Sequence, residues 1–225
     1  MPVPALLSRT RLALIAGPYL LVSGVHLWGK FQDDPVAGMV ESVTKPMLMP
    51  TLLLAFLAAV PALRALAVWL TAAGITLSWL GDILLYNFVV GLIFFLVAHL
   101  AYIPVFVVAF PERRMRWWSV AYVAVFGALV WVLAPHLGDL LVPVIVYGVV
   151  LCAMAAVASK GNWQTALGGA LFLASDSILA LNRFHPDDVI PWNSGFLVMV
   201  TYLAAQGLIA AGILRQLRAG VRAVV

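Results

Sequence analysis

Two aspartates stand inside segments that are otherwise apolar and long enough to cross a membrane. Asp82 lies in the sequence SWLGDILL, and Asp176 lies in LFLASDSILA. A carboxylate at the centre of a membrane helix costs roughly 2.5 to 3.5 kcal/mol on insertion scales, so such a residue usually marks a functional site. The chemistry that two carboxyl groups offer is acid–base catalysis. We therefore take both aspartates as candidate catalytic residues.

Motifs of other reaction classes are missing from the sequence. It contains no G-x-S-x-G nucleophile elbow, no H-E-x-x-H zinc motif, no Walker A motif and no dinucleotide fingerprint. The four histidines stand in separate segments or loops without the spacing of metal ligands. Acid–base chemistry by carboxyl groups is what remains, and it requires neither a metal nor an organic cofactor.

Other polar side chains share helix faces within the apolar segments. His99 and Tyr102 are three residues apart, and Tyr202 and Gln206 are four residues apart, so each pair lies on one face of a helix. Together with the aspartates, they are predicted to line a polar cavity with apolar walls. The candidate supporting or substrate-binding residues are Lys45, His99, Tyr102, Tyr147, Ser175, Tyr202 and Gln206.

Three of these residues also have structural interpretations. A satisfied hydrogen bond between helices explains His99 nearly as well as catalysis does. For Ser175, a hydrogen bond to the preceding turn is the favoured alternative. Lys45 is expected at the outer mouth of its span, where it either extends to the membrane interface or forms a structural ion pair with Asp82.

The composition places these residues in a membrane protein. Of the 225 residues, 64% are hydrophobic and only 10% are charged, and the mean hydropathy is +1.08. A soluble domain would be roughly 45 to 50% apolar and about 25% charged. Since a membrane-spanning helix needs about 20 apolar residues, we predict one all-α membrane domain over residues 1–225 with eight spans. They cover roughly 11–28, 46–63, 65–86, 88–110, 117–134, 139–158, 163–182 and 195–214.

The basic residues orient the predicted bundle. With the N-terminus in the cytoplasm and alternating spans, ten of the 13 Lys and Arg residues fall on the cytoplasmic side, as the positive-inside rule requires. They are Arg9, Arg11, Arg64, Arg113, Arg114, Arg116, Lys160, Arg215, Arg218 and Arg222, whereas Lys30, Lys45 and Arg183 fall on the other side. Both termini are then cytoplasmic. The net charge of +4 is a topology signal that needs no nucleic-acid partner.

A weak internal repeat relates the two halves of the chain. GITLSWLGDILLYNF and GALFLASDSILALNRF both carry a serine, an aspartate, an aliphatic run and an asparagine, and the aspartates are 94 residues apart. The segments that begin at Gly91 and Gly195 also resemble each other, with an offset of 104 residues. Four spans in each half predict a parallel four-plus-four arrangement.

At these residues the sequence resembles the YhhN family of membrane proteins. The resemblance rests on five motifs in order, which are TKPMLMP at 44–50, SWLGDILL at 78–85, GLIFFLVAHLAYI at 91–103, GGALFLASDSILA at 168–180 and YLAAQGLI at 202–209. It covers roughly residues 40 to 210. The family's polar motif positions carry over as Lys45, Asp82, His99, Tyr102, Ser175, Asp176, Tyr202 and Gln206.

The resemblance implies an eight-span enzyme of the lysoplasmalogenase type, located in the plasma membrane if the source is bacterial. Such enzymes cleave the vinyl ether bond of a lysoplasmalogen and release a fatty aldehyde and a glycerophospho-alcohol. The reaction needs an acid that protonates the β-carbon and a negative group that stabilises the resulting cation. Asp82 and Asp176 are expected to divide these two roles, with a lysophospholipid as substrate and membrane lipids as the surroundings.

Two other classes of protein remain open from the residues. A proton-coupled or small-molecule transporter also uses paired carboxyl groups within the membrane. A non-catalytic lipid-binding protein is the second alternative. The sequence assigns neither the preferred head group nor an oligomeric state.

Overall fold

Long apolar stretches fold as α-helices within a membrane, because a helix satisfies its backbone polar groups internally. The structure is a computed structural model that describes residues 7–32, 35–187, 189–190 and 192–223. The regular secondary structure of these residues is entirely helical, with no strand among them, which confirms the predicted all-α class. The α-helices are α1 (Arg9–Phe31), α2 (Pro35–Ala59), α3 (Leu66–Leu84), α4 (Phe88–Ala109), α5 (Ala121–Leu137), α6 (Leu141–Ala158), α7 (Trp163–Phe184) and α8 (Ser194–Ala223).

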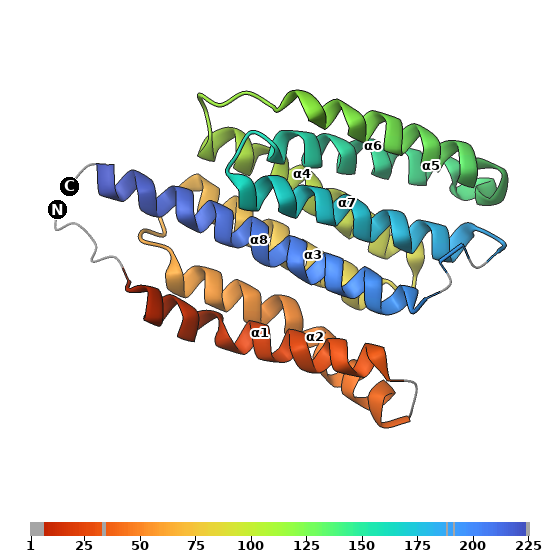
Figure 1. The fold of residues 1–225 in the computed structure, drawn as a ribbon, viewed down its shortest axis with the longest axis horizontal. Coiled ribbons are helices and arrows are strands. Elements are labelled where there is room, and N and C mark those ends of the chain that lie inside the picture. Colours follow the sequence, from red (N-terminus) through yellow and green to blue (C-terminus); the bar gives the residue numbers. More distant parts are fainter. Residues whose placement is uncertain (1–6, 33–34, 188, 191, 224–225) are drawn as a thin grey trace.

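The helices lie side by side along the long axis of the molecule (Figure 1). The pair α1 and α2 forms one side of the bundle, and the pair α5 and α6 forms the opposite side. Helices α3, α4, α7 and α8 lie between these pairs. Helix α8 contacts α1, α2, α3, α4 and α7, whereas α5 and α6 contact the rest of the bundle through α4 and α7.

Seven segments within the described residues are long and apolar enough to cross a membrane. Six of them are single helices. The seventh, Trp117–Ala158, contains both α5 and α6 together with the short 3-10 helices η1 (Trp117–Val120) and η2 (Gly138–Leu140). The chain reverses direction at Gly138, whose φ of +48° is a conformation that favours glycine. By length and composition, the chain is therefore a multi-pass membrane protein.

Most helices agree with the predicted spans to within a few residues, but two are longer. Helix α8 continues to Ala223, beyond the predicted end at residue 214. Helix α2 begins at Pro35, eleven residues before the predicted start of its span at residue 46. Proline is favourable at the first position of a helix, whereas Pro46 and Pro50 lie inside α2, where proline normally breaks the backbone hydrogen bonding.

A tryptophan on the neighbouring helix explains part of this tolerance. Pro50 has no N–H group, so the carbonyl of Pro46 lacks its usual helical partner. The indole Nε1 of Trp79 on α3 donates a hydrogen bond of 2.9 Å to this carbonyl. Freed carbonyl groups in membrane helices are tolerated when a neighbouring helix supplies a donor in this way.

Replacing Trp79 with phenylalanine is therefore expected to destabilise the protein. The substitution removes the indole donor and leaves the Pro46 carbonyl unpaired, which costs about 1–3 kcal/mol. Thermal unfolding in detergent measures the change, and Trp131→Phe is the matched control because Trp131 is 81% exposed on α5. Equal melting temperatures for the Trp79 variant and the wild type would contradict this role of the indole.

A candidate active site between the helices

One cavity of about 250 Å³ lies within the bundle, and every helix from α1 to α8 contributes to its wall. Its lining begins at the end of the bundle at which α1, α3, α5 and α7 finish, and it extends past the middle of α5 and α6. Six of the nine predicted site residues line it, namely Lys45, Asp82, Tyr147, Ser175, Asp176 and Tyr202. The fold therefore brings both membrane aspartates to the same internal space.

Asp82 faces the cavity from the last turn of α3. Its carboxylate accepts a hydrogen bond of 2.7 Å from the hydroxyl of Tyr202 on α8. The preceding residue is glycine, and a Cβ atom at Gly81 would lie only 2.7 Å from the ring of Phe95. The absence of a side chain at Gly81 thus lets α4 pack closely against the turn that carries Asp82.

Asp176 faces the same cavity from α7. It accepts a hydrogen bond from the hydroxyl of Tyr147, which is a buried residue of α6. Each aspartate is therefore held by one tyrosine from a different helix. A hydroxyl that donates to a carboxylate fixes the direction of the carboxylate and stabilises its charged form.

A chain of hydrogen bonds extends behind Asp82. Tyr102 donates to the side-chain oxygen of Gln206 at 2.6 Å, and the amide nitrogen of Gln206 donates to the Tyr202 hydroxyl at 3.4 Å. Tyr102 and Gln206 are fully buried, and neither lines the cavity. The polar faces predicted for α4 and α8 thus meet in the interior of the bundle. There Tyr102 and Gln206 position Tyr202 and do not line the cavity.

His99 is also fully buried and lies outside the cavity wall. Its Nδ1 atom is 2.5 Å from the carbonyl oxygen of Phe95 in the same helix, so the predicted hydrogen bond between helices is wrong. The ring packs edge to face against Phe172 and Tyr147, with centroid distances of 4.6 and 5.5 Å. His99 therefore supports the tyrosine that holds Asp176.

Ser175 connects two helices. Its hydroxyl donates a hydrogen bond of 3.0 Å to the carbonyl of Val198 on α8. The predicted hydrogen bond to the preceding turn is therefore wrong for Ser175, although the neighbouring Ser177 does form one, to the carbonyl of Leu173 at 2.6 Å. Ser175 fixes α7 against α8 directly beside Asp176.

Lys45 lines the cavity from inside α2, because the helix begins ten residues before it. Its predicted place at the outer mouth of a membrane span stays a prediction, since the helix extends beyond the predicted start of that span. The alternative of a structural ion pair with Asp82 is wrong, since the one ion pair among the described residues joins Lys30 to Glu41.

Sequence reasoning missed two parts of the wall. Lys30 lines the cavity, but the predicted first span ended at residue 28 and left this lysine in a loop. The aliphatic and aromatic wall formed by α5 and α6 was also missed, because its residues look like ordinary lipid-facing positions. Its members include Phe126, Leu129, Val130, Leu133, Leu137, Val144 and Leu151.

The described residues contain no group of three or more His, Cys, Asp or Glu side chains that could hold a metal ion. The cavity wall contains two carboxyls, their two phenols and two ammonium groups, together with the polar side chains of Ser175, Ser177, Asn182 and Cys152. This set of groups can transfer protons and stabilise developing charge.

Comparisons with known proteins match most of this chain. Residues 40–213 match the YhhN family. Lysoplasmalogenases from Mycobacterium bovis and Mycobacterium tuberculosis are each 40% identical over 162 residues, which is 64% of this chain and 59% of the relative. The chain thus matches less than two thirds of the length of these curated relatives. No solved structure matches it.

Proposed function

This chain belongs to the YhhN family, and we propose that it is a lysoplasmalogenase-type hydrolase that acts on lysophospholipids within the membrane. The observation that carries the proposal is the pairing of two carboxyl groups, each bound by a tyrosine, around one cavity with a long apolar wall. The 40% identity to two lysoplasmalogenases supports the same reaction.

The proposed reaction cleaves a vinyl ether. One aspartic acid donates its proton to the β-carbon of the double bond, and the electrons of the double bond form the new C–H bond. The carbon attached to oxygen becomes an oxocarbenium ion, which the other aspartate stabilises. Water adds to this carbon and returns a proton to the first carboxylate. The resulting hemiacetal collapses to a fatty aldehyde and a glycerophospho-alcohol.

The apolar surroundings suit this division of roles. Burial disfavours the charged form of a carboxyl group, and two neighbouring carboxyls resist simultaneous ionisation. A pair of this kind can therefore hold one proton and one negative charge at neutral pH. Tyr202 and Tyr147 keep the two carboxyl groups of Asp82 and Asp176 directed within the cavity.

The membrane arrangement that we propose has one domain with eight spans, in which α5 and α6 cross separately. The N-terminus and C-terminus lie in the cytoplasm, because the basic residues gather at the end of the bundle where α1 begins and α8 finishes. At that end Arg218 donates a hydrogen bond to the carbonyl of Leu7. Asp82 and Asp176 then lie in the outer half of the membrane, which in a bacterium is the plasma membrane.

The parallel repeat is part of this proposal. Tyr102 and Gln206 are 104 residues apart, which equals the offset between Gly91 and Gly195. They form a hydrogen bond with each other at 2.6 Å. Contact between equivalent positions is what a two-fold axis along the membrane normal produces, so this contact supports the four-plus-four arrangement.

The activity is tested with two substrates that differ in one bond. Purified protein in detergent is expected to release fatty aldehyde from a 1-alkenyl-lysophospholipid and none from the 1-alkyl analogue. The saturated ether has no double bond to protonate, so it measures non-specific cleavage. Absence of aldehyde from every vinyl-ether lysophospholipid would refute the hydrolase, and proton-dependent uptake into liposomes would then favour the transporter.

A further inference from the structure

The chemical character of the cavity wall changes from one side of the bundle to the other. Helices α1 and α2 contribute the two lysines, Lys30 and Lys45, and the central helices α3 and α7 contribute the two aspartates. Helices α5 and α6 contribute aliphatic and aromatic side chains. Figure 1 shows these helix pairs in the same order across the bundle. The cavity therefore has its cations at one side and its carboxyl groups in the middle, and no charged residue that the structure describes lines the other side, although the central helices contribute apolar side chains as well.

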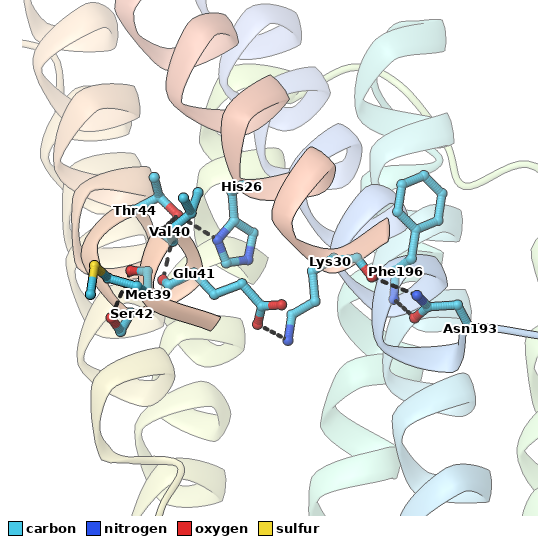
Figure 2. A network of polar contacts seen from close by, with 9 residues as sticks. All are labelled: His26, Lys30, Met39, Val40, Glu41, Ser42, Thr44, Asn193 and Phe196. Atoms are coloured by element: carbon cyan, nitrogen blue, oxygen red, sulfur yellow. Dashed lines mark hydrogen bonds and ion pairs between the residues drawn. The ribbon is translucent and has the colours of Figure 1, made fainter. Parts of the chain in front are cut away.

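Lys30 is held at the cationic side by neighbouring helices. Its ammonium group forms an ion pair with Glu41 of α2, and the two side chains are only 29% and 25% exposed. Its backbone carbonyl accepts a hydrogen bond of 2.5 Å from the side-chain amide of Asn193, whose oxygen accepts from the backbone of Phe196 at 2.9 Å (Figure 2). These contacts fix the ammonium at the edge of the cavity.

Lys45 supplies the second cation. It lies four residues after Glu41, so both side chains share one face of α2. The hydroxyl of the adjacent Thr44 donates to the carbonyl of Val40 at 2.7 Å and lies in a hydrogen bond of 2.8 Å with Nδ1 of His26, which fixes α1 and α2 against each other here (Figure 2). Among the described residues, Lys45 forms no ion pair within 4 Å, although its charge acts on Asp82 across the cavity. A partly buried ammonium group without a direct ion pair is costly, so an anionic ligand would stabilise it.

We propose that Lys30 and Lys45 form a phosphate-binding subsite for the head group of the lipid whose ether bond lies at the aspartates. This inference rests on the proposed function and extends it to substrate selection. In a lysophospholipid, three glycerol carbons separate the phosphate from the ether oxygen, and the hydrocarbon chain follows. The order phosphate, reactive bond and chain matches the order lysines, aspartates and apolar wall. Glu41 orients Lys30 when no phosphate is bound.

Binding of uncleavable lipids tests the subsite independently of turnover. The full chain in maltoside detergent is titrated with a 1-alkyl-glycerophospholipid and with the 1-alkylglycerol that lacks phosphate, and intrinsic tryptophan fluorescence reports binding. Lys30→Met and Lys45→Met are each expected to weaken binding of the phospholipid roughly tenfold, as loss of a charge-assisted contact does. Binding of the alkylglycerol is expected to change less than about twofold, which also shows that the variants are folded.

Three further variants separate charge from structure. Lys45→Arg keeps the positive charge and is expected to bind the phospholipid within about threefold of the wild type. Glu41→Gln releases Lys30 from its ion pair, so this variant is expected to bind the phospholipid at least as tightly as the wild type does. Lys160→Met removes a lysine from the loop between α6 and α7, away from the cavity, and is the matched control. A tenfold weakening in Glu41→Gln would show that the Lys30–Glu41 pair is structural and would overturn the inference.

Two further comparisons show whether the subsite binds a lipid phosphate or a free anion, and separate a failure of the subsite from a failure of the proposed hydrolase. Inorganic phosphate alone is expected not to bind measurably, because it lacks the chain; binding as tight as that of the phospholipid would reassign the subsite to a free anion. Equal wild-type affinity for the phospholipid and the alkylglycerol would refute the subsite even if aldehyde is released. Selective loss of phospholipid binding in the lysine variants would sustain it even if no aldehyde is released.

Discussion

Replacing either Asp82 or Asp176 with asparagine is expected to slow aldehyde release from an alkenyl lysophospholipid by at least two orders of magnitude. Asparagine has nearly the same shape as aspartate, but it neither donates an acidic proton nor carries a negative charge. Loss of a general acid or of a group that stabilises the transition-state charge lowers the rate by about 10²–10⁴-fold. Steady-state release of aldehyde by the purified variants measures the loss.

A matched substitution controls for the change of charge. Asp139 is exposed in η2 and lies outside the cavity wall, so the Asp139→Asn variant is expected to keep wild-type activity. The double variant of Asp82 and Asp176 should be little slower than the slower single variant, because two residues that act on one transition state are not additive. Both single variants should still bind the uncleavable alkyl phospholipid. Retention of more than about a tenth of the activity in either one would remove that residue from the chemistry.

The sequence predicts the helices of this protein well, because each apolar segment is close to the length that a membrane span requires. The start of α2 could not be predicted in this way. Pro46 and Pro50 are typical of a helix boundary, and the hydrogen bond from Trp79 of α3 to the Pro46 carbonyl, which helps the helix to continue, is not visible in the sequence. For the same reason the sequence did not show that Lys45 lies ten residues inside a helix.

The candidate site was predicted as a set of residues but not as a set of contacts. Helical spacing correctly placed Tyr202 and Gln206 on one face of α8. It gave no information on which helix this face meets, so the hydrogen bonds to Asp82 and from Tyr102 emerge only from the packing. The partner of Asp176 was equally hidden, because Tyr147 stands in an aliphatic span with no polar neighbour in sequence.

Loss of the hydroxyl of Tyr202 or Tyr147 is expected to have the second largest effect on kcat. Tyr202→Phe and Tyr147→Phe each remove a hydroxyl that donates to a site carboxylate, without creating a large cavity. A hydrogen bond to a charged group contributes about 1.5–3 kcal/mol, which corresponds to a loss in kcat of roughly 10- to 100-fold. Aldehyde release at saturating substrate measures kcat directly. Tyr86→Phe is the control, because Tyr86 is 86% exposed at the end of α3.

Removal of the hydroxyl at Tyr102 separates positioning from direct contact with the carboxylate. Tyr102→Phe breaks the hydrogen bond to Gln206 but leaves the Tyr202–Asp82 contact in place, so its effect on kcat should be smaller than that of Tyr202→Phe. The effect of Tyr202→Phe should also nearly vanish in an Asp82→Asn background, because the two groups act as one unit. If the tyrosine effect is undiminished there, the hydroxyl acts on the substrate itself and not through Asp82.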